Sequence, residues 1–275
     1  MKQQILVYDD ACPLCSAYSS AFVKAGLLPE NGRQSFSEAS SDLLNKTNPL
    51  KRNDEIPLIN METGQVLYGI DALLAILGGR FPFAKKAGSA GPVKYLLTRL
   101  YKLVSYNRRS IVATTPVPGT YNCCPTFNAK YRLLFLAAGL LFNSVLLFPL
   151  HHYLFTNSIF GSAGVAQAQA AHVLFVAANI CTASTLKKQQ GFEYAAQVNM
   201  LALLAVLLLL PLMVVNMVIS AVPSLLNNMY IAMVTLFIIK EYFRRMQFAG
   251  ILSHHLNIVC FNIYCLLLFL IYLAR

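Results

Sequence analysis

The sequence predicts a small α/β domain followed by an all-α bundle of about five membrane-spanning helices. Three observations lead to this fold class. The composition is 57% hydrophobic and only 12% charged, the charges are unevenly distributed, and the long uncharged apolar runs follow a strongly basic segment. Such a composition excludes a disordered chain, a collagen and a disulfide-rich miniprotein, and it is typical of a membrane protein.

Charge divides the chain into three segments. Residues 1–79 carry 6 basic and 9 acidic side chains, residues 80–132 carry 10 and none, and residues 133–275 carry 6 and 2. The basic segment directly precedes the apolar runs and contains no nucleic-acid-binding motif, so we expect it to face a lipid bilayer and not nucleic acid. The predicted organisation is therefore an α/β domain, a basic amphipathic linker and a transmembrane helical domain.

The first predicted elements are a buried strand at residues 5–8 and a helix over residues 16–28. The strand is a short run of apolar, β-prone residues that ends before Asp9. Between the two elements, Cys12 and Cys15 form a C-x-x-C motif. A strand that leads into C-x-x-C at the start of a helix is the thioredoxin arrangement.

This position gives the two cysteines different predicted roles. The amides and dipole at a helix start favour a thiolate, so we expect a lowered pKa and a nucleophilic role for Cys12. Cys15 lies one turn later and can resolve a mixed disulfide. Asp9 is predicted to tune the thiol or to relay its proton. Cytosolic cysteines are more often catalytic or metal-binding than structural, which agrees with these roles.

Two alternatives to redox chemistry stay open for the C-x-x-C motif. The cysteines could be unreactive, or they could form half a zinc site that Cys123 and Cys124 complete. Adjacent cysteines are poorly arranged to chelate one tetrahedral ion together, so we predict no metal ion and no cofactor.

Downstream, a β-hairpin is predicted over residues 55–69, and a last helix over residues 71–77. An Ile-Pro bond introduces the hairpin.

The chain resembles the DCC family of thiol-disulfide oxidoreductases over about residues 3–79. The matching features are Asp9, Cys12 and Cys15 in a D-x-x-C-x-x-C signature, the Ile56-Pro57 hairpin, and Gly69, Asp71 and Ala72. The resemblance implies a thioredoxin-like fold and a proline, Pro57, that aligns an extended thiol substrate from a cis peptide bond. One departure is Asp9-Asp10 where the family usually has Asp-Gly, and the extra carboxylate would oppose thiolate formation.

The basic segment contains a predicted amphipathic helix over residues 92–109. Its apolar positions follow helical spacing and its basic residues occupy the remaining positions. Such a helix could lie in the lipid headgroup region, or it could pack on the α/β domain. After it, residues 121–132 resemble the segment that opens the membrane part of some bacterial DCC proteins. Cys123 or Cys124 could relay electrons from the Cys12/Cys15 pair, or could simply be a buried turn cysteine.

Five spans are predicted in residues 133–275. No charged residue occurs between Arg132 and Lys187, or between Glu193 and Lys240, and each stretch is long enough for two spans of ~20 residues. One more span is predicted after Arg245. Positive clusters recur after every second span, which predicts a cytoplasmic amino terminus. The start of the chain does not resemble a signal peptide, which agrees with this orientation.

Polar residues within these spans have two predicted roles. Glu241 and Arg245 stand at i, i+4 on a helix and are expected to form an ion pair. The asparagines within the spans either join helices by hydrogen bonds or line a cavity: Asn143, Asn179, Asn199, Asn216 and Asn262.

The predicted function is that of a membrane-anchored thiol-disulfide oxidoreductase. It would act on protein or small-molecule thiols and disulfides at the cytoplasmic face of a bacterial inner membrane. One alternative is a non-catalytic membrane scaffold whose thioredoxin-like module docks a partner. Another is electron transfer to a quinone-like carrier, which the spans permit without indicating it.

Overall fold

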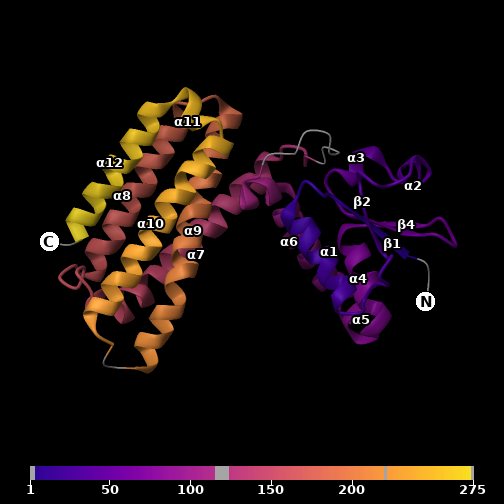
Figure 1. The fold of residues 1–275 in the computed structure, drawn as a ribbon, viewed down its shortest axis with the longest axis horizontal. Coiled ribbons are helices and arrows are strands. Elements are labelled where there is room, and N and C mark those ends of the chain that lie inside the picture. Colours follow the sequence, from indigo (N-terminus) through magenta and orange to yellow (C-terminus); the bar gives the residue numbers. More distant parts are fainter. Residues whose placement is uncertain (1–3, 115–123, 220–221, 274–275) are drawn as a thin grey trace. The chain divides into compact units, whose positions relative to one another are not determined.

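The structure is a computed structural model that describes residues 4–114, 124–219 and 222–273. The chain divides into two compact units, residues 1–132 and residues 133–275. The first unit contains the sheet and its covering helices, and the second is entirely helical in its described part (Figure 1).

The sheet of the first unit has the strand order β2-β1-β3-β4. Its strands are β1 (Gln4–Tyr8), β2 (Arg33–Ser35), β3 (Pro57–Asn60) and β4 (Val66–Tyr68). β1 runs parallel to β2 and antiparallel to β3, and β3 and β4 form the predicted hairpin. β2 was not predicted, because its three polar residues show no apolar alternation.

Helices cover both faces of this sheet. The helices of the first unit are α1 (Pro13–Lys24), α2 (Ser41–Asn45), α3 (Pro49–Arg52), α4 (Gly69–Arg80), α5 (Pro82–Ser89) and α6 (Gly91–Val112). Leu6 and Leu58 point to one face and pack with Ile76 of α4, whereas Val7 and Ile59 point to the other face. This alternation follows from the two-residue period of a strand.

Helix α1 begins and ends at residues suited to those positions. Pro13 occupies its first turn, where the missing N–H has no helical partner to lose. At its end Gly26 adopts a φ of 67°, the left-handed conformation that commonly terminates helices. The helix therefore begins within the cysteine motif, with Cys12 as its N-cap and Cys15 in its first turn.

The described residues between 80 and 132 group with the sheet and its helices in the first unit. Helix α6 packs against α1, α4 and α5. Of the two predicted positions for this helix, packing on the α/β domain is the one that the structure has. Its Tyr101 hydroxyl accepts a hydrogen bond of 2.9 Å from the Ile56 N–H, and Asn107 and Arg108 are buried. Another side of α6 exposes apolar residues: Val93, Leu96, Leu100 and Val104.

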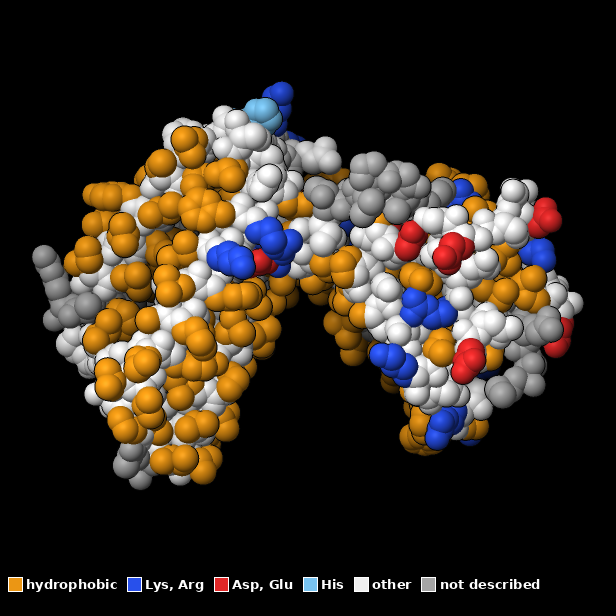
Figure 2. Space-filling model, viewed as in Figure 1, with side chains coloured by type: hydrophobic (Ala, Val, Ile, Leu, Met, Phe, Trp, Pro, Cys, Tyr) orange, Lys and Arg blue, Asp and Glu red, His pale blue; other side chains and the backbone are white. Residues whose placement is uncertain are grey.

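The second unit is built from long apolar helices. They are α7 (Ala129–Tyr153), α8 (Val165–Ser184), α9 (Lys188–Val218), α10 (Ser224–Phe248) and α12 (Leu256–Leu273), with the short η1 (Phe155–Asn157) and α11 (Ile251–His254) between them. Three of them, α7, α8 and α9, are long and apolar enough to cross a membrane. Hydrophobic side chains cover most of the face of this unit shown in Figure 2, whereas charges are scattered over the first unit.

Small residues and asparagines hold these helices together. α9 packs against both α8 and α10, and α8 packs against α12. Gly139 of α7 faces the Asn199 side chain so closely that a Cβ there would meet the amide nitrogen at 2.3 Å. Close approach of this kind is typical of membrane helices. Pro149 lies inside α7, which continues to Tyr153.

The asparagines take both of the predicted roles. Asn179 and Asn262 each bond to the Tyr194 hydroxyl, at 2.6 and 2.7 Å, which connects α8, α9 and α12. Asn199 donates to the Phe135 carbonyl oxygen on α7. Asn143 and Asn262 line a cavity. Hydrogen bonds between helices therefore account for much of the polar content of this unit.

Candidate functional site

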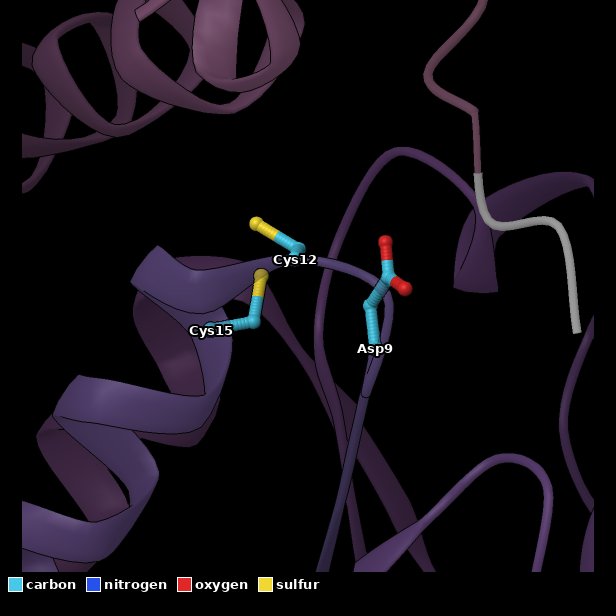
Figure 3. Close-up of side chains that lie close together, drawn as sticks. All are labelled: Asp9, Cys12 and Cys15. Atoms are coloured by element: carbon cyan, nitrogen blue, oxygen red, sulfur yellow. The ribbon is translucent and has the colours of Figure 1, made fainter. Parts of the chain in front are cut away.

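Asp9, Cys12 and Cys15 come together where β1 ends and α1 begins. Their ligand-type atoms, one carboxylate oxygen and two sulfurs, all lie within 4.8 Å of one another. Figure 3 shows the three side chains gathered at the start of α1, with the Cys15 sulfur directed toward Cys12. The sequence prediction that these residues share one site agrees with this geometry.

The turn between strand and helix is held by Asp9. Its Oδ1 accepts a hydrogen bond of 3.1 Å from the Ala11 N–H, and its carbonyl oxygen accepts one of 3.2 Å from the Cys12 N–H. Cys12 is the N-cap residue of α1, and its carbonyl accepts from the Ser16 N–H at 3.0 Å. Cys12 therefore stands where the free amides of the helix favour negative charge.

Arg108 is the residue that sequence reasoning missed. Its guanidinium Nη2 lies 3.4 Å from Asp9 Oδ2 and donates a hydrogen bond of 2.9 Å to the Asn53 carbonyl. Both side chains of the ion pair are buried. A signal was available in the sequence, since Tyr101, Ser105 and Arg108 follow helical spacing on the side of α6 that faces the sheet and α1.

These contacts make Cys12 the more acidic of the two thiols. Hydrogen bonds from the Cys15 thiol and backbone N–H lower the pKa of Cys12 to about 6, aided by the Arg108 charge and opposed by burial and by Asp9. The same hydrogen bond, together with burial, raises the pKa of Cys15. A thiolate on one cysteine and a retained proton on the other is the arrangement that a nucleophile and a resolving thiol require.

Asp9 and Arg108 respond to burial in opposite ways. Burial raises the pKa of Asp9, and the Arg108 charge only partly offsets this effect. Burial lowers the pKa of Arg108, but the neighbouring Cys15, Asp9 and Cys12 more than compensate and raise it. The site therefore holds a fixed cation beside a carboxylate that binds protons more readily than usual.

The two sulfurs are poorly accessible, which the sequence did not predict. Cys12 and Cys15 are each only 4% exposed, although Pro13 between them lies at the surface. Tyr18 of α1 lies beside Cys15, and burial raises the pKa of its hydroxyl. Both thiols are therefore largely shielded from solvent in this structure.

The donor set could in principle hold a metal ion, but its electrostatics disfavour one. Two sulfurs and one carboxylate are the residues that the described part of the chain brings together here. Tetrahedral zinc needs a fourth ligand, and the Arg108 cation already neutralises the Asp9 carboxylate. The chemistry of this set favours a thiolate stabilised by an arginine.

Pro57 begins β3 and is buried. The register that pairs Leu6 with Leu58 sets Pro57 opposite Val7 when it is continued by one residue. Pro57 thus lies near the end of β1 from which Asp9 emerges. Every peptide bond between described residues is trans, including Ile56-Pro57, which corrects the cis bond implied by the resemblance.

Of the predicted relay cysteines, Cys123 lies outside the described residues, and Cys124 is half-buried. Thr126, two residues after Cys124, donates hydrogen bonds to Asp54, from its N–H at 2.8 Å and from its hydroxyl at 3.0 Å. Asp54 is the neighbour of Asn53, which accepts from Arg108. The segment that carries Cys124 and Arg108 of α6 therefore both form hydrogen bonds to the loop that contains Asn53 and Asp54.

No family model, curated protein or solved structure matches the chain.

Proposed function

We propose that the first unit is a thioredoxin-like thiol-disulfide oxidoreductase of the DCC type. The observation that carries the proposal is a buried C-x-x-C motif at a helix start, with the pKa of Cys12 lowered to about 6 beside an arginine. The strand order β2-β1-β3-β4 supports the fold, since a β-α-β unit is followed by an antiparallel hairpin and a helix.

In the reducing direction, the Cys12 thiolate attacks a sulfur of the substrate disulfide. The substrate S–S bond breaks, a mixed disulfide to Cys12 forms, and the departing sulfur takes a proton. Cys15 then gives its proton to Asp9, whose raised pKa suits it as a base, and attacks the Cys12 sulfur. The Cys12–Cys15 bond forms, the mixed disulfide breaks, and the second substrate sulfur leaves and takes the proton from Asp9. The products are a reduced substrate and a Cys12–Cys15 disulfide. A dithiol reductant would return the pair to the reduced state.

Arg108 acts in this scheme as a positioning residue. Its charge stabilises the Cys12 thiolate, and its bond to the Asn53 carbonyl fixes the guanidinium beside Asp9. Because the sulfurs are buried, we expect slim, extended disulfides to react and bulky ones to be excluded. Pro57, next to the end of β1, would contact the extended substrate.

The second unit would anchor this activity in a membrane through five spans. We add α10 and α12 to the three helices that are long and apolar enough to cross a membrane, since α10 has 25 residues and α12 is a shorter apolar helix. The positive clusters at alternate helix ends support a cytoplasmic first unit. We place the protein in a bacterial inner membrane on the strength of the DCC resemblance.

The pH dependence of Cys12 alkylation tests the proposal. The reduced full chain in detergent would be treated with iodoacetamide, and modification of Cys12 followed by mass spectrometry of its peptide. A thiol reacts as its thiolate, so the rate should reach half its maximum near pH 6. In the urea-unfolded chain the half-point should lie near the free-thiol value of about 8.5. A half-point near 8.5 in the folded chain would favour the scaffold alternative.

A trapping experiment identifies the substrate. The Cys15→Ser variant should retain a partner as a mixed disulfide on Cys12, because the resolving thiol is gone. The Cys12→Ser variant is the matched control and should retain none. Mapping of disulfides in the oxidised wild-type chain tests the relay separately: a link from Cys12 or Cys15 to Cys123 or Cys124 supports it, and a Cys12–Cys15 link alone rejects it.

A further inference from the structure

The second unit contains a partly open cavity that the proposed redox chemistry does not use. It has a volume of about 270 Å³ and is bounded by residues of α7, α8, α9, α10 and α12. Most of its lining is aliphatic. The residues that give it chemical character are Asn143, His172, Phe175, Tyr242, Asn262 and Phe269.

Two polar atoms at this cavity have no hydrogen-bond partner among the described residues. They are the side-chain oxygen of Asn143, a residue only 4% exposed, and the hydroxyl of Tyr242. Leaving a buried polar group without a partner costs about 1–3 kcal/mol, and within a membrane the surrounding hydrocarbon offers no alternative. The Asn262 side chain lies near the Tyr242 hydroxyl, but its amide donates to the Tyr194 hydroxyl and the Ile258 carbonyl, so it leaves that hydroxyl without a well-formed hydrogen bond.

The two unpartnered atoms have complementary requirements. The Asn143 oxygen needs a donor, and the Tyr242 hydroxyl can donate to an acceptor. A single hydroxyl group supplies both functions. A lipid acyl chain supplies neither, although it would fill the apolar part of the cavity.

Two aromatic rings point to the shape of the molecule that carries this hydroxyl. Phe175 of α8 and Phe269 of α12 both line the cavity, with ring centroids 6.2 Å apart and planes inclined by 50°. Aromatic side chains favour flat aromatic partners in offset or edge-on contact. Pockets of this kind, mostly apolar with a few convergent polar groups, are typical small-molecule sites.

We propose that this cavity binds a neutral lipophilic molecule with a hydroxyl-bearing aromatic ring, that is, a quinol or an alkylphenol. The ring lies against Phe175 and Phe269, and its hydroxyl accepts from Tyr242 and donates to the Asn143 oxygen. The alkyl tail occupies the aliphatic remainder of the cavity. The inference rests on the second unit alone and does not depend on the activity of Cys12.

Binding to the full chain in lipid nanodiscs tests the proposal with three probes. 4-Nonylphenol and decylubiquinol carry the ring hydroxyl, and nonylbenzene has the same tail and ring without it. We expect the first or the second to raise the melting temperature of the bundle in a saturable way, and nonylbenzene to bind at least about 10-fold more weakly, as loss of one buried hydrogen-bonding group predicts. The relative affinities of 4-nonylphenol and decylubiquinol show whether the cavity prefers an alkylphenol or a quinol.

Variants separate a binding role from a structural one. Tyr242→Phe and Asn143→Leu each remove a polar atom that has no partner in the unliganded protein, so the melting temperature without probe should be unchanged or higher. Each should weaken binding of the hydroxyl probe about 10-fold or more. Tyr230→Phe is the matched control, because its hydroxyl donates to the Leu208 carbonyl, away from the cavity, and probe binding should persist.

Equal binding of 4-nonylphenol and nonylbenzene, or unchanged probe affinity in both cavity variants, would overturn the proposal and assign the cavity to hydrocarbon chains of the bilayer.

Discussion

Both units bury an arginine beside a carboxylate, but they do so in different ways. In the first unit, the Arg108 Nη2 lies 3.4 Å from the Asp9 Oδ2. In the second unit, Glu241 accepts hydrogen bonds of 2.5–2.8 Å from Arg244 and Arg245. The predicted Glu241–Arg245 ion pair is thereby confirmed.

The second cluster continues into the bundle. Arg245 donates a bond of 2.7 Å to the Gln197 side-chain oxygen, and the Gln197 amide donates one of 2.6 Å to Glu193. A network in which each charge is satisfied fixes the position of α9 against α10 and leaves little charge for chemistry. The looser pair in the first unit leaves the Arg108 cation able to act on Cys12. We propose that the tight cluster serves structure and that the looser pair serves the reactivity of Cys12.

The largest expected effect is that of Arg108→Met, which leaves the Asp9 carboxylate buried and unpaired. We expect a loss of about 3 kcal/mol in the stability of the first unit, measured by urea unfolding of the full chain followed by pulse proteolysis. Adding Asp9→Asn should recover much of this loss, since no unpaired charge remains. Lys94→Met breaks an exposed pair with Asp71 and should cost less than about 1 kcal/mol. Equal losses in the two single variants would contradict a special role for the buried pair.

Glu241→Gln probes the tight cluster of the second unit. The side chain of Arg245 is 4% exposed and would lose its carboxylate while keeping Gln197, so we expect the bundle to lose about 2 kcal/mol. Thermal melting followed by circular dichroism in detergent measures this loss. Arg244→Gln removes a largely exposed partner of the same carboxylate and should cost under about 1 kcal/mol. A smaller loss of thermal stability in Glu241→Gln than in Arg244→Gln would show that the buried Glu241–Arg245 pair does not stabilise the bundle.

The stability of the first unit should depend on pH through the ionisation of Cys12. A lowered pKa in the folded chain means that Cys12 contributes stability above the unfolded value of about 8.5 and loses it as pH falls toward 6. We expect the reduced wild-type first unit to be on the order of 1 kcal/mol more stable at pH 9 than at pH 6, relative to Cys12→Ser. Urea unfolding at the two pH values measures the difference. Parallel profiles for both proteins would mean that the thiolate is not favoured in the fold.

The smallest effect concerns helix packing in the second unit. In Gly139→Ala, the new methyl would displace the Asn199 side chain and weaken its hydrogen bond to the Phe135 carbonyl, so we expect a loss of about 1 kcal/mol in thermal stability. Gly164→Ala at the start of α8 meets no atom within 4 Å and should change stability by only a few tenths of a kcal/mol. If Gly139→Ala left the thermal stability unchanged, the close approach of Gly139 to Asn199 would not contribute to the stability of the bundle.

Local features of the sequence determined the elements that bear the cysteines and the apolar helices. The strand, the C-x-x-C motif and the helix start lie within a few residues of one another, so propensity and spacing are sufficient to predict their order. The uncharged stretches between Arg132 and Lys187 and after Glu193 likewise predicted long apolar helices, because hydrocarbon tolerates few charges.

Only the tertiary structure placed Arg108 beside Asp9, since these residues are separated by almost the whole first unit and their meeting depends on how α6 packs. The same holds for the burial of Cys12, for the polar strand β2, and for the cavity that gathers Asn143 and Tyr242. Each of these features is made by contacts between distant segments, and a sequence pattern reports only what neighbours along the chain require.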